Sequence, residues 1–534
     1  MALPQTTDAT IVESGDKAPH RDALRPQDST GAGVYRVKLA RVWPFVVAGF
    51  IVVSLYSIHL YYCQHSTLQF LDAFFADSDM HSNLLWAKGI REQGWLNPVP
   101  YHPWGEWMQP IAPYAQWLNW WGGGQVFQQS PLYTYLLSLF MHRYFLMRIV
   151  QALMSIGTCI FLGLLSARIA GRTAGWIVFW LSALYAPFYA YSWPFLRDGL
   201  GWLLSAALLW ALAELTHSEW PSRRARLFGW TVGVLLGLGF LARETFVLII
   251  PLTWFALCLF SRGRHYWGII PRVTIATVLT ISPLVMRNWI VHAPLFSTSN
   301  RFAEVFISCN ARGAHPYLFL LPPGTRDILY HSDEEPIKVI RLTVASYPDG
   351  VRGWLKLEGQ KLLSLFDPFE SPDNLCIYFV AHISPLVRFG LQYWMILAPA
   401  IGGLLLSIWR RDTAQQWLWG LLPVLLLSII VAAPLSRYRQ SLMVCFIPWA
   451  GYFLAYVVLL VRRHEFLKAA YFGVALLFGW ILILGPLARQ PSNHYERPTE
   501  YIYSAEIFHQ LGDEQDENAM LAILRAKFPG AVRP

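Results

Sequence analysis

Two acidic residues stand close together in the stretch DSDMHSNLLWAKGI, which covers positions 77–90. They follow the first long apolar run of a chain in which only 14% of the residues are charged. Asp79 opens a stretch with helical spacing, because Asn83, Trp86 and Ile90 recur on one face of a helix. An aspartate at a helix start often caps free backbone N–H groups, whereas a carboxylate at a membrane edge could accept a proton in catalysis. The local sequence leaves both roles open for Asp79, and Asp77 could supply the cap instead.

Further polar and charged residues stand where apolar runs end, on connections that the predicted topology places on one side of a membrane. Each of them alone is explained by an ion pair or by a long side chain that reaches the interface. Acidic and basic groups gathered beside apolar walls would together suit an anionic lipid phosphate whose tail stays in the bilayer. The residues are Arg197, Asp198, Arg243, Glu244, Arg287, Asn288, Arg437 and Arg439.

Motifs for other chemistries are absent from the sequence. It contains no GxxxxGK[ST] phosphate loop, no GxGxxG and no GxSxG nucleophile elbow. His102 and Glu106 are four residues apart and could bind a metal if that segment were helical, but Pro100 and Pro103 favour an ordinary loop.

Composition predicts the elements that position these residues. The chain of 534 residues is 55% hydrophobic and 15% aromatic, whereas a soluble protein of this size would carry about a quarter charged residues. Apolar runs long enough to cross a hydrocarbon core of about 30 Å recur along it. We predict an all-α polytopic membrane protein of about 11 transmembrane helices. Their approximate ranges are 43–62, 145–167, 174–192, 198–216, 227–241, 245–260, 272–286, 386–409, 416–434, 440–461 and 468–486.

The net charge of +9 is explained by topology, and no nucleic-acid partner is expected. Lys and Arg collect in short connections between apolar runs, as the positive-inside rule requires. Arg36, Lys38 and Arg41 precede the first run, which places the N-terminus in the cytoplasm. Among the cysteines, Cys63, Cys309, and Cys376 fall in segments predicted outside the cytoplasm, where a disulfide could form.

The predicted organisation has three parts. Residues 1–42 are polar and expected to be a disordered cytoplasmic N-terminus, and residues 43–486 form the transmembrane domain. This domain carries two large extracytoplasmic loops, 64–144 with interfacial helices and 288–385. Residues 487–534 form an extracytoplasmic helical tail. Transporters usually keep connections short, so large loops on one side favour chemistry or recognition there.

Several motifs in a fixed order resemble a known family. They are DSDMHSNLLWAKGI, FQQSPLYTYLLSLF, GFLARETFVLIIPL, SPLVMRNWIVHAPLFSTSNRFAEVFISCN, YPDGVRGWLKLEGQKLLSLFDPFESPDN and SRYRQSLMVCFIPWAGYFL. The set resembles the polytopic GT-C glycosyltransferases, specifically bacterial relatives of the protein O-mannosyltransferases and of the lipid A aminoarabinose transferase (glycosyltransferase family 39-like). The resemblance covers most of residues 43–460 and leaves out the first forty residues and the tail. Where that family often has a GN pair, this chain has SCN, ending at Asn310.

The resemblance implies roles for individual residues. Asp79 takes the place of the family's catalytic base in the first outer loop, and Asp198 that of a second acidic residue. Some relatives bind a divalent metal through loop Glu and His residues, which His102 and Glu106 match poorly, so the cofactor is left unknown. The implied binding residues are Arg243, Arg287, Lys361, Arg437 and Arg439 for the donor phosphate, and Gln129, Glu370 and Asn374 for the acceptor or its loop.

The implied function is an inverting membrane glycosyltransferase of the inner or plasma membrane with an extracytoplasmic active site. It would move a hexosyl or pentosyl group from a polyprenyl-phosphate donor to a hydroxyl of a glycan, glycolipid or protein. One alternative is a lipid or sugar transporter or flippase, which predicts paired repeats and broken helices that the sequence does not display. The other alternative is a non-catalytic assembly protein.

Overall fold

The computed structural model describes residues 31–219, 221–260, 268–485 and 497–529. The chain divides into two compact units, residues 1–52 and residues 53–534. Over the described ranges the regular structure is helical, apart from one isolated β-bridge between Tyr185 and Leu391. The predicted all-α class is therefore confirmed for this part of the chain. Helix α1 (Gly31–Gln64) begins before the boundary expected at residue 42, and the expected disorder of residues 1–30 lies outside the described residues.

Eight helices in the described ranges are long and apolar enough to cross a membrane. The chain is thus built as a multi-pass membrane protein, while the count of eleven spans stays a prediction. Helices α11 (Phe246–Phe260) and α19 (Tyr393–Arg410) are apolar but shorter. The eight are the Trp43–Gln64 part of α1, α6 (Tyr144–Ala170), α9 (Asp198–Thr216), α10 (Arg223–Ala242), α12 (Ile269–Ile290), η2 with α20 (Gln416–Val431), α21 (Ser436–Arg439) with η3 and α22 (Met443–Arg462), and α23 (Phe466–Leu484).

Two of the predicted spans are interrupted rather than continuous. Residues 174–192 form α7 (Arg172–Ala183) and the short α8 (Ala186–Ala190), and residues 386–409 form α18 (Pro385–Phe389) and α19. Pro187 and Pro385 each occupy the first turn of the short helix, where proline is tolerated. The two interruptions bond to each other, because Ala186 N–H donates to the Leu391 carbonyl and Leu391 N–H donates to the Leu184 carbonyl.

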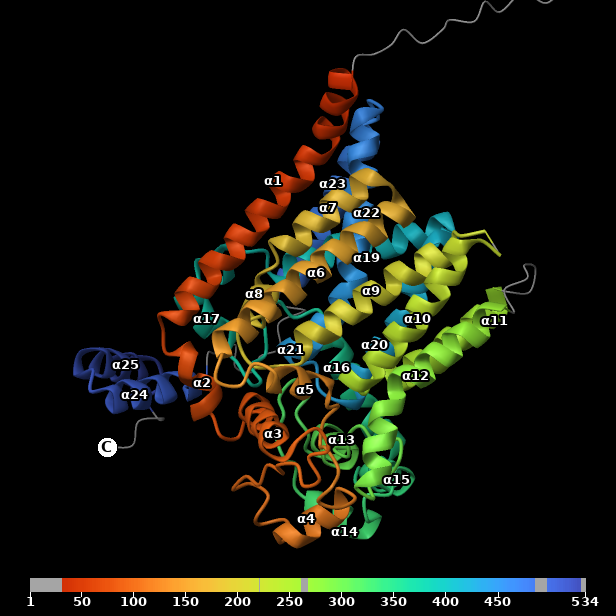
Figure 1. The fold of residues 1–534 in the computed structure, drawn as a ribbon. Helices are drawn as coiled ribbons and strands as arrows, with labels where there is room; N and C mark the ends of the chain where they lie inside the picture. Colours follow the sequence, from red (N-terminus) through yellow and green to blue (C-terminus); the bar gives the residue numbers. More distant parts are fainter. Residues whose placement is uncertain (1–30, 220, 261–267, 486–496, 530–534) are drawn as a thin grey trace, which may run out of the picture. The chain divides into compact units, whose positions relative to one another are not determined.

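The long helices of the second unit pack around small residues. Helix α6 packs against α7 and α9, α10 against α9 and α12, and α22 against α7 and α19 (Figure 1). At Gly403 on α19, a Cβ atom would meet the Trp449 carbonyl oxygen of α22 at 1.9 Å, so only glycine fits this approach. Close backbone contact through small residues is the usual way in which membrane helices associate.

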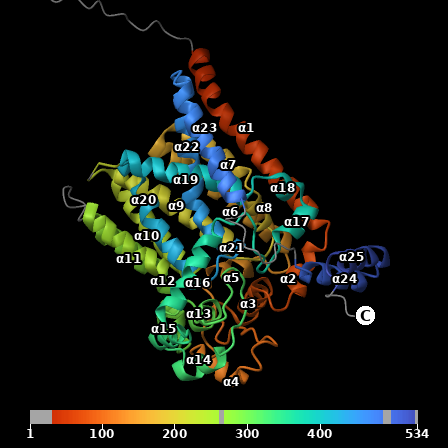
Figure 2. The same cartoon turned by 180° about the vertical axis from the view of Figure 1, so that it is seen from behind.

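The two large loops fold together beyond one end of the long helices (Figure 2). The side chains of Trp117, Trp120 and Trp121 pack with Phe306 and Leu329 in a shared apolar core. The first loop contains α2 (Leu68–Phe74), α3 (Asp79–Gln93), α4 (Tyr114–Trp120) and α5 (Leu132–Ser138); the second contains α13 (Phe302–Asn310), α14 (Thr325–Ser332), α15 (Pro336–Ala345), α16 (Val351–Ser364) and α17 (Ile377–Ile383).

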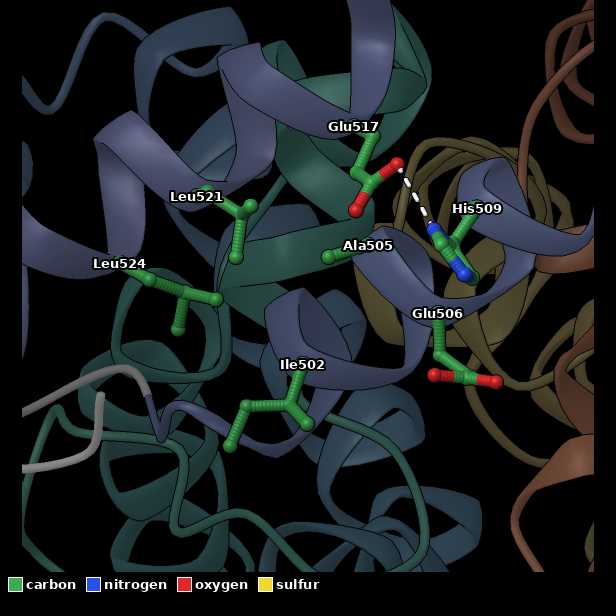
Figure 3. A pocket seen from close by; sticks show the side chains of 7 residues that line it. All are labelled: Ile502, Ala505, Glu506, His509, Glu517, Leu521 and Leu524. Atoms are coloured by element: carbon green, nitrogen blue, oxygen red, sulfur yellow. Dashed lines mark hydrogen bonds and ion pairs between the residues drawn. The ribbon is translucent and has the colours of Figure 1, made fainter. Parts of the chain in front are cut away.

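The tail forms a hairpin of two helices, α24 (Thr499–Leu511) and α25 (Glu514–Lys527). Helix α24 packs against α2, and the hydroxyl groups of Thr67 and Ser504 are 2.8 Å apart. Figure 3 shows a groove between the two helices, in which His509 faces Glu517 at 3.1 Å.

All six cysteines lie in the described ranges, and no two of them form a disulfide. The disulfide that the sequence left open for Cys63, Cys309 and Cys376 is therefore not formed. All three side chains are buried.

Candidate active site

The start of α3 settles which residue caps the helix. Ser78 is the N-cap, with extended backbone, and its hydroxyl oxygen accepts a hydrogen bond from His81 N–H at 3.2 Å. Asp77 is exposed, so the sequence-based assignment of the cap to either aspartate is wrong. Serine competes well for this position because its short side chain reaches back to the first-turn amides. Asp79 then begins the helix with a carboxylate that is available to other groups.

The Asp79 carboxylate is held by donors from four separate segments. Its Oδ1 accepts from Gln129 Nε2 at 2.7 Å and lies 3.4 Å from Arg301 Nη1. Its Oδ2 lies 2.8 Å from Arg437 Nη2 and 3.2 Å from Asn374 Nδ2. The Asp79 amide also donates to Asn374 Oδ1 at 2.6 Å. The structure thus brings together four predicted site residues, Asp79, Gln129, Asn374 and Arg437, and it adds Arg301.

Arg437, at the start of α21, connects three carboxylates. Besides Asp79, its Nε lies 2.8 Å from Asp373 Oδ2 and its Nη1 lies 3.8 Å from Asp198 Oδ2. Asp198 begins α9 and also accepts from Arg243 Nη1 at 2.9 Å, at the end of α10. The predicted residues Asp198 and Arg243 therefore belong to the same network, which joins the ends of three membrane-spanning segments.

A second pair of charges adjoins this network. Arg197 Nη1 lies 2.5 Å from Glu244 Oε1, and Glu244 also accepts from the amide and hydroxyl of Ser130. Arg301 pairs with Glu304 on α13, with Nη2 to Oε1 at 2.6 Å. Sequence reasoning did not assign roles to Arg301 or Asp373. The adjacency of Asp373 to Asn374 was an available signal, whereas nothing in the local sequence around Arg301 points to Asp79.

Electrostatics keep Asp79 ionised. Burial by itself disfavours the charged carboxylate, but the guanidinium groups of Arg437, Arg301 and Arg197 outweigh it and lower the pKa of Asp79. At Glu244, burial is likewise outweighed by Arg197, and the pKa falls to about 2. Asp373 behaves differently, because burial and the nearby Asp79 and Asp198 charges prevail over Arg437 and raise its pKa.

Two predicted phosphate ligands are instead bound to the protein backbone. Arg287 donates to the carbonyl oxygens of Leu96, Gln125 and Asn97 at 2.7–2.8 Å. Arg439 donates to backbone carbonyls of residues 364–369, with 2.8 Å to Asp367. These contacts hold loop segments to helix ends, and they do not favour a phosphate-binding role for either arginine.

Lys361 and Glu370 are also engaged elsewhere. Lys361 Nζ lies 2.8 Å from Asn310 Oδ1, 2.8 Å from the Ile430 carbonyl oxygen and 3.1 Å from Glu358 Oε1. Glu370 pairs with Arg439 at 2.9 Å and is buried. Both side chains therefore complete structural contacts, which their position in the sequence did not reveal.

The predicted metal pair is not arranged as a site. Residues 101–110 contain no helix, the His102 ring stacks on Trp121 with centroids 5.7 Å apart, and Glu106 is exposed. In the part of the chain that the structure describes, no three His, Cys, Asp or Glu side chains are grouped closely enough to hold a metal ion. The carboxylates around Asp79 alternate with guanidinium groups, which a bound cation would have to displace. This donor set does not fit a metal.

The arrangement suits an anionic reactant. Asp79, Asp373 and Arg301 keep 17–21% of their side chains exposed, whereas Asp198 is fully buried. Part of the ionised Asp79 carboxylate and part of the Arg301 guanidinium group are thus accessible to a reactant. Guanidinium donors match phosphate oxygens, and a carboxylate can orient or deprotonate a hydroxyl group.

No family model matches the chain, and no curated protein matches it. Among solved structures, the chain is similar to the oligosaccharyltransferase of Archaeoglobus fulgidus in its apo form, with 11% identity and a TM-score of 0.41 over 88% of this chain. A second structure, the archaeal oligosaccharyltransferase AglB from Archaeoglobus fulgidus with an inhibitory peptide and a dolichol-phosphate, gives 12% identity and a TM-score of 0.38 over 86% of this chain. The chain spans 59% and 58% of the lengths of these two proteins.

Proposed function

We propose that this protein is a membrane glycosyltransferase that moves a sugar from a polyprenyl-phosphate donor to a hydroxyl group of an extracytoplasmic acceptor. The observation that carries the proposal is the Asp79 carboxylate, ionised, partly exposed and surrounded by guanidinium groups at the ends of membrane-spanning helices. A lipid-linked phosphate would enter at this depth with its chain in the bilayer, and the polar loops would admit the acceptor.

Arg437 and Arg243 are the proposed phosphate ligands. Both lie where membrane helices end; Arg437 faces the Asp79 and Asp198 carboxylates, and Arg243 faces Asp198. Their positive charge would stabilise the phosphate as the bond between its oxygen and the anomeric carbon breaks. Arg287, Lys361 and Arg439 are left out of this role because their donors are already used by other protein groups.

Asp79 is the proposed base. Its lowered pKa keeps it charged at neutral pH, so it would accept a hydrogen bond from the acceptor hydroxyl and take the proton as the oxygen attacks. The hydroxyl oxygen forms the new bond to the anomeric carbon while the electron pair of the old bond leaves with the phosphate. A single displacement of this kind inverts the anomeric centre and requires no covalent enzyme intermediate. Gln129 and Asn374 would hold the carboxylate in orientation.

The test compares Asp79→Asn with Asp77→Asn, since Asp77 is exposed and does not cap the helix. Surface glycans and glycolipids are analysed by mass spectrometry in cells that lack the protein or carry each form. We expect the product to disappear without the protein, to fall about 100-fold or more in Asp79→Asn and to persist in Asp77→Asn.

Normal product from folded Asp79→Asn would refute the base assignment. If no sugar is transferred from any polyprenyl-phosphate donor while the purified protein moves lipid across vesicles, the transporter alternative is correct.

A further inference from the structure

Arg437 has no guanidinium nitrogen that is clear of a carboxylate. Nε faces Asp373 at 2.8 Å, Nη2 faces Asp79 at 2.8 Å and Nη1 faces Asp198 at 3.8 Å. A phosphate that binds an arginine in bidentate fashion uses two of these nitrogens at once. In the proposed function, the donor phosphate therefore competes with these carboxylates for Arg437.

Charge balance leads to the same conclusion. The network contains one more carboxylate than guanidinium groups, so it offers no surplus positive charge to an incoming phosphate. Its carboxylates are Asp79, Asp198, Asp373, Glu244 and Glu304, and its guanidinium groups are Arg197, Arg243, Arg301 and Arg437.

The three carboxylates on Arg437 are not equally anchored. Asp198 is fully buried and bonded to Arg243 at 2.9 Å. Asp79 has Gln129 and Arg301 as further partners. Asp373 is 17% exposed, and besides Arg437 its Oδ2 has only the neighbouring Asn374 Nδ2, at 3.2 Å, among the bonds described. Asp373 is thus the carboxylate that can leave at the lowest cost.

We propose that Asp373 is an exchangeable partner of Arg437, which holds the guanidinium in place when no donor is bound and yields to the donor phosphate. This assignment rests on the proposed function. Asp373 is a positioning residue in this scheme, since it acts on the substrate through Arg437. When no donor is bound, Arg437 therefore keeps a defined position.

Protonation would assist the exchange. The raised pKa of Asp373 has burial as its largest cause, with Asp79 and Asp198 adding to it and Arg437 and Arg497 opposing it. Neutralising Asp373 removes its hold on Arg437 and also the excess negative charge. Phosphate binding should therefore be tighter at low pH. The other titratable groups that interact electrostatically with Asp373 are Cys309, Tyr191 and Tyr438.

The experiment measures binding of a short polyprenyl methyl phosphodiester to the full-length protein in nanodiscs by calorimetry. This probe keeps one negative charge from about pH 5 to about pH 8, so its own titration does not contribute. Binding is measured at about pH 5 and about pH 8, and we expect wild-type protein to bind about tenfold tighter at the lower pH. Asp373→Asn should bind with the tighter affinity at both pH values, whereas Arg437→Gln should bind weakly at both.

A matched control is Glu334→Gln, because Glu334 also has a raised pKa but interacts with Glu304 and not with Arg437. It should keep the wild-type pH dependence. If binding requires Arg437 but Asp373→Asn retains the wild-type affinity and pH dependence, the exchange proposal is overturned. If wild-type protein binds no phosphodiester at either pH, the proposed function itself is wrong.

Discussion

At the scale of single residues, side-chain exposure separates Asp79, which could react, from buried charged side chains that hold the fold. Lys361 is buried and has three oxygen partners from different segments, so it has no capacity left for a ligand. Asp79 has several donors too, but 18% of its side chain is exposed, so a ligand can reach it. Removal of a partner from a buried charge is costly, which makes such residues essential to stability without making them catalytic.

One carboxyl outside the proposed chemistry predicts a pH dependence of stability. Burial is the largest cause of the raised pKa of Glu334, about 8, with Glu304 and Asp333 as further causes. Asp333 and Glu334 both have positive φ angles, 48° and 54°, which fix this short turn beside α13. Because the folded state holds the proton more tightly, its stabilising effect is complete below about pH 4.5 and is lost as pH rises to about 8.

Melting temperatures at several pH values test this effect. The melting temperature of wild-type protein should fall between about pH 5 and about pH 8. At about pH 8, Glu334→Gln should melt at a higher temperature than wild type. Glu335→Gln, an exposed neighbour paired with Lys338, should follow the wild type. Parallel curves for wild type and Glu334→Gln would show that Glu334 is not buried as described.

At the scale of elements, the tail hairpin braces the segment that holds Asp79. Glu500 on α24 is fully buried and accepts from the Cys376 amide at 2.7 Å. Cys376 is two residues from Asn374, which bonds both the amide and the carboxylate of Asp79. Arg497 completes the contact by pairing with Glu500 at 2.6 Å. The tail, which lay outside the family resemblance, is thus connected to the candidate site.

Loss of this brace should weaken both stability and activity. Glu500→Ala leaves the Cys376 amide and Arg497 without their buried partner, at a cost of about 2–4 kcal/mol in the free energy of unfolding. Glycosyl transfer should fall along with the melting temperature, since the 373–376 segment loses its anchor.

The control for this change is Glu506→Ala on the same helix. Glu506 is exposed and lines the groove of Figure 3. Its removal should leave both quantities unchanged. Equal melting temperatures for Glu500→Ala and wild type would contradict the brace.

At the scale of the whole molecule, the two loops form one folded body at the end of the long helices that carries the charged network. The loop residues Asp79, Arg301 and Asp373 meet the helix-end residues Asp198, Arg243 and Arg437 there. The proposed function requires this end to face away from the cytoplasm, where the acceptor is. The positive-inside pattern predicts the same orientation, since it places the basic connections at the other end.

Labelling of single introduced cysteines tests this orientation. The six native thiols give little background, because five are buried and Cys258 is half-buried. Glu106→Cys, in the first loop, should react with a membrane-impermeant maleimide in intact cells. Arg463→Cys, after α22, should react only after the membrane is opened. The opposite result would invert the topology and remove the active site from the proposed side.

The sequence alone determined the helical class, most span positions and the residues at span ends, because hydrocarbon thickness and charge placement act on local composition. Asp198–Thr216, for example, was predicted at the bounds that α9 has. It could not determine the interruptions of two spans at residues 184–185 and 390–392, since the replacement bonds join residues about 200 apart in the chain. The resemblance selected Asp79, and its role stays a prediction.

Tertiary structure alone decided which arginines meet Asp79. Arg287 and Arg437 look alike in sequence, each at a span end, yet one is bonded to backbone carbonyls and the other to carboxylates. Asp77 and Asp79 also look alike in sequence. The structure distinguishes them because Ser78, and neither aspartate, caps α3. A guanidinium group binds whichever oxygens the fold brings to it, and those oxygens come from distant segments. Contacts of this kind are set by packing and cannot be read from the residues around each charge.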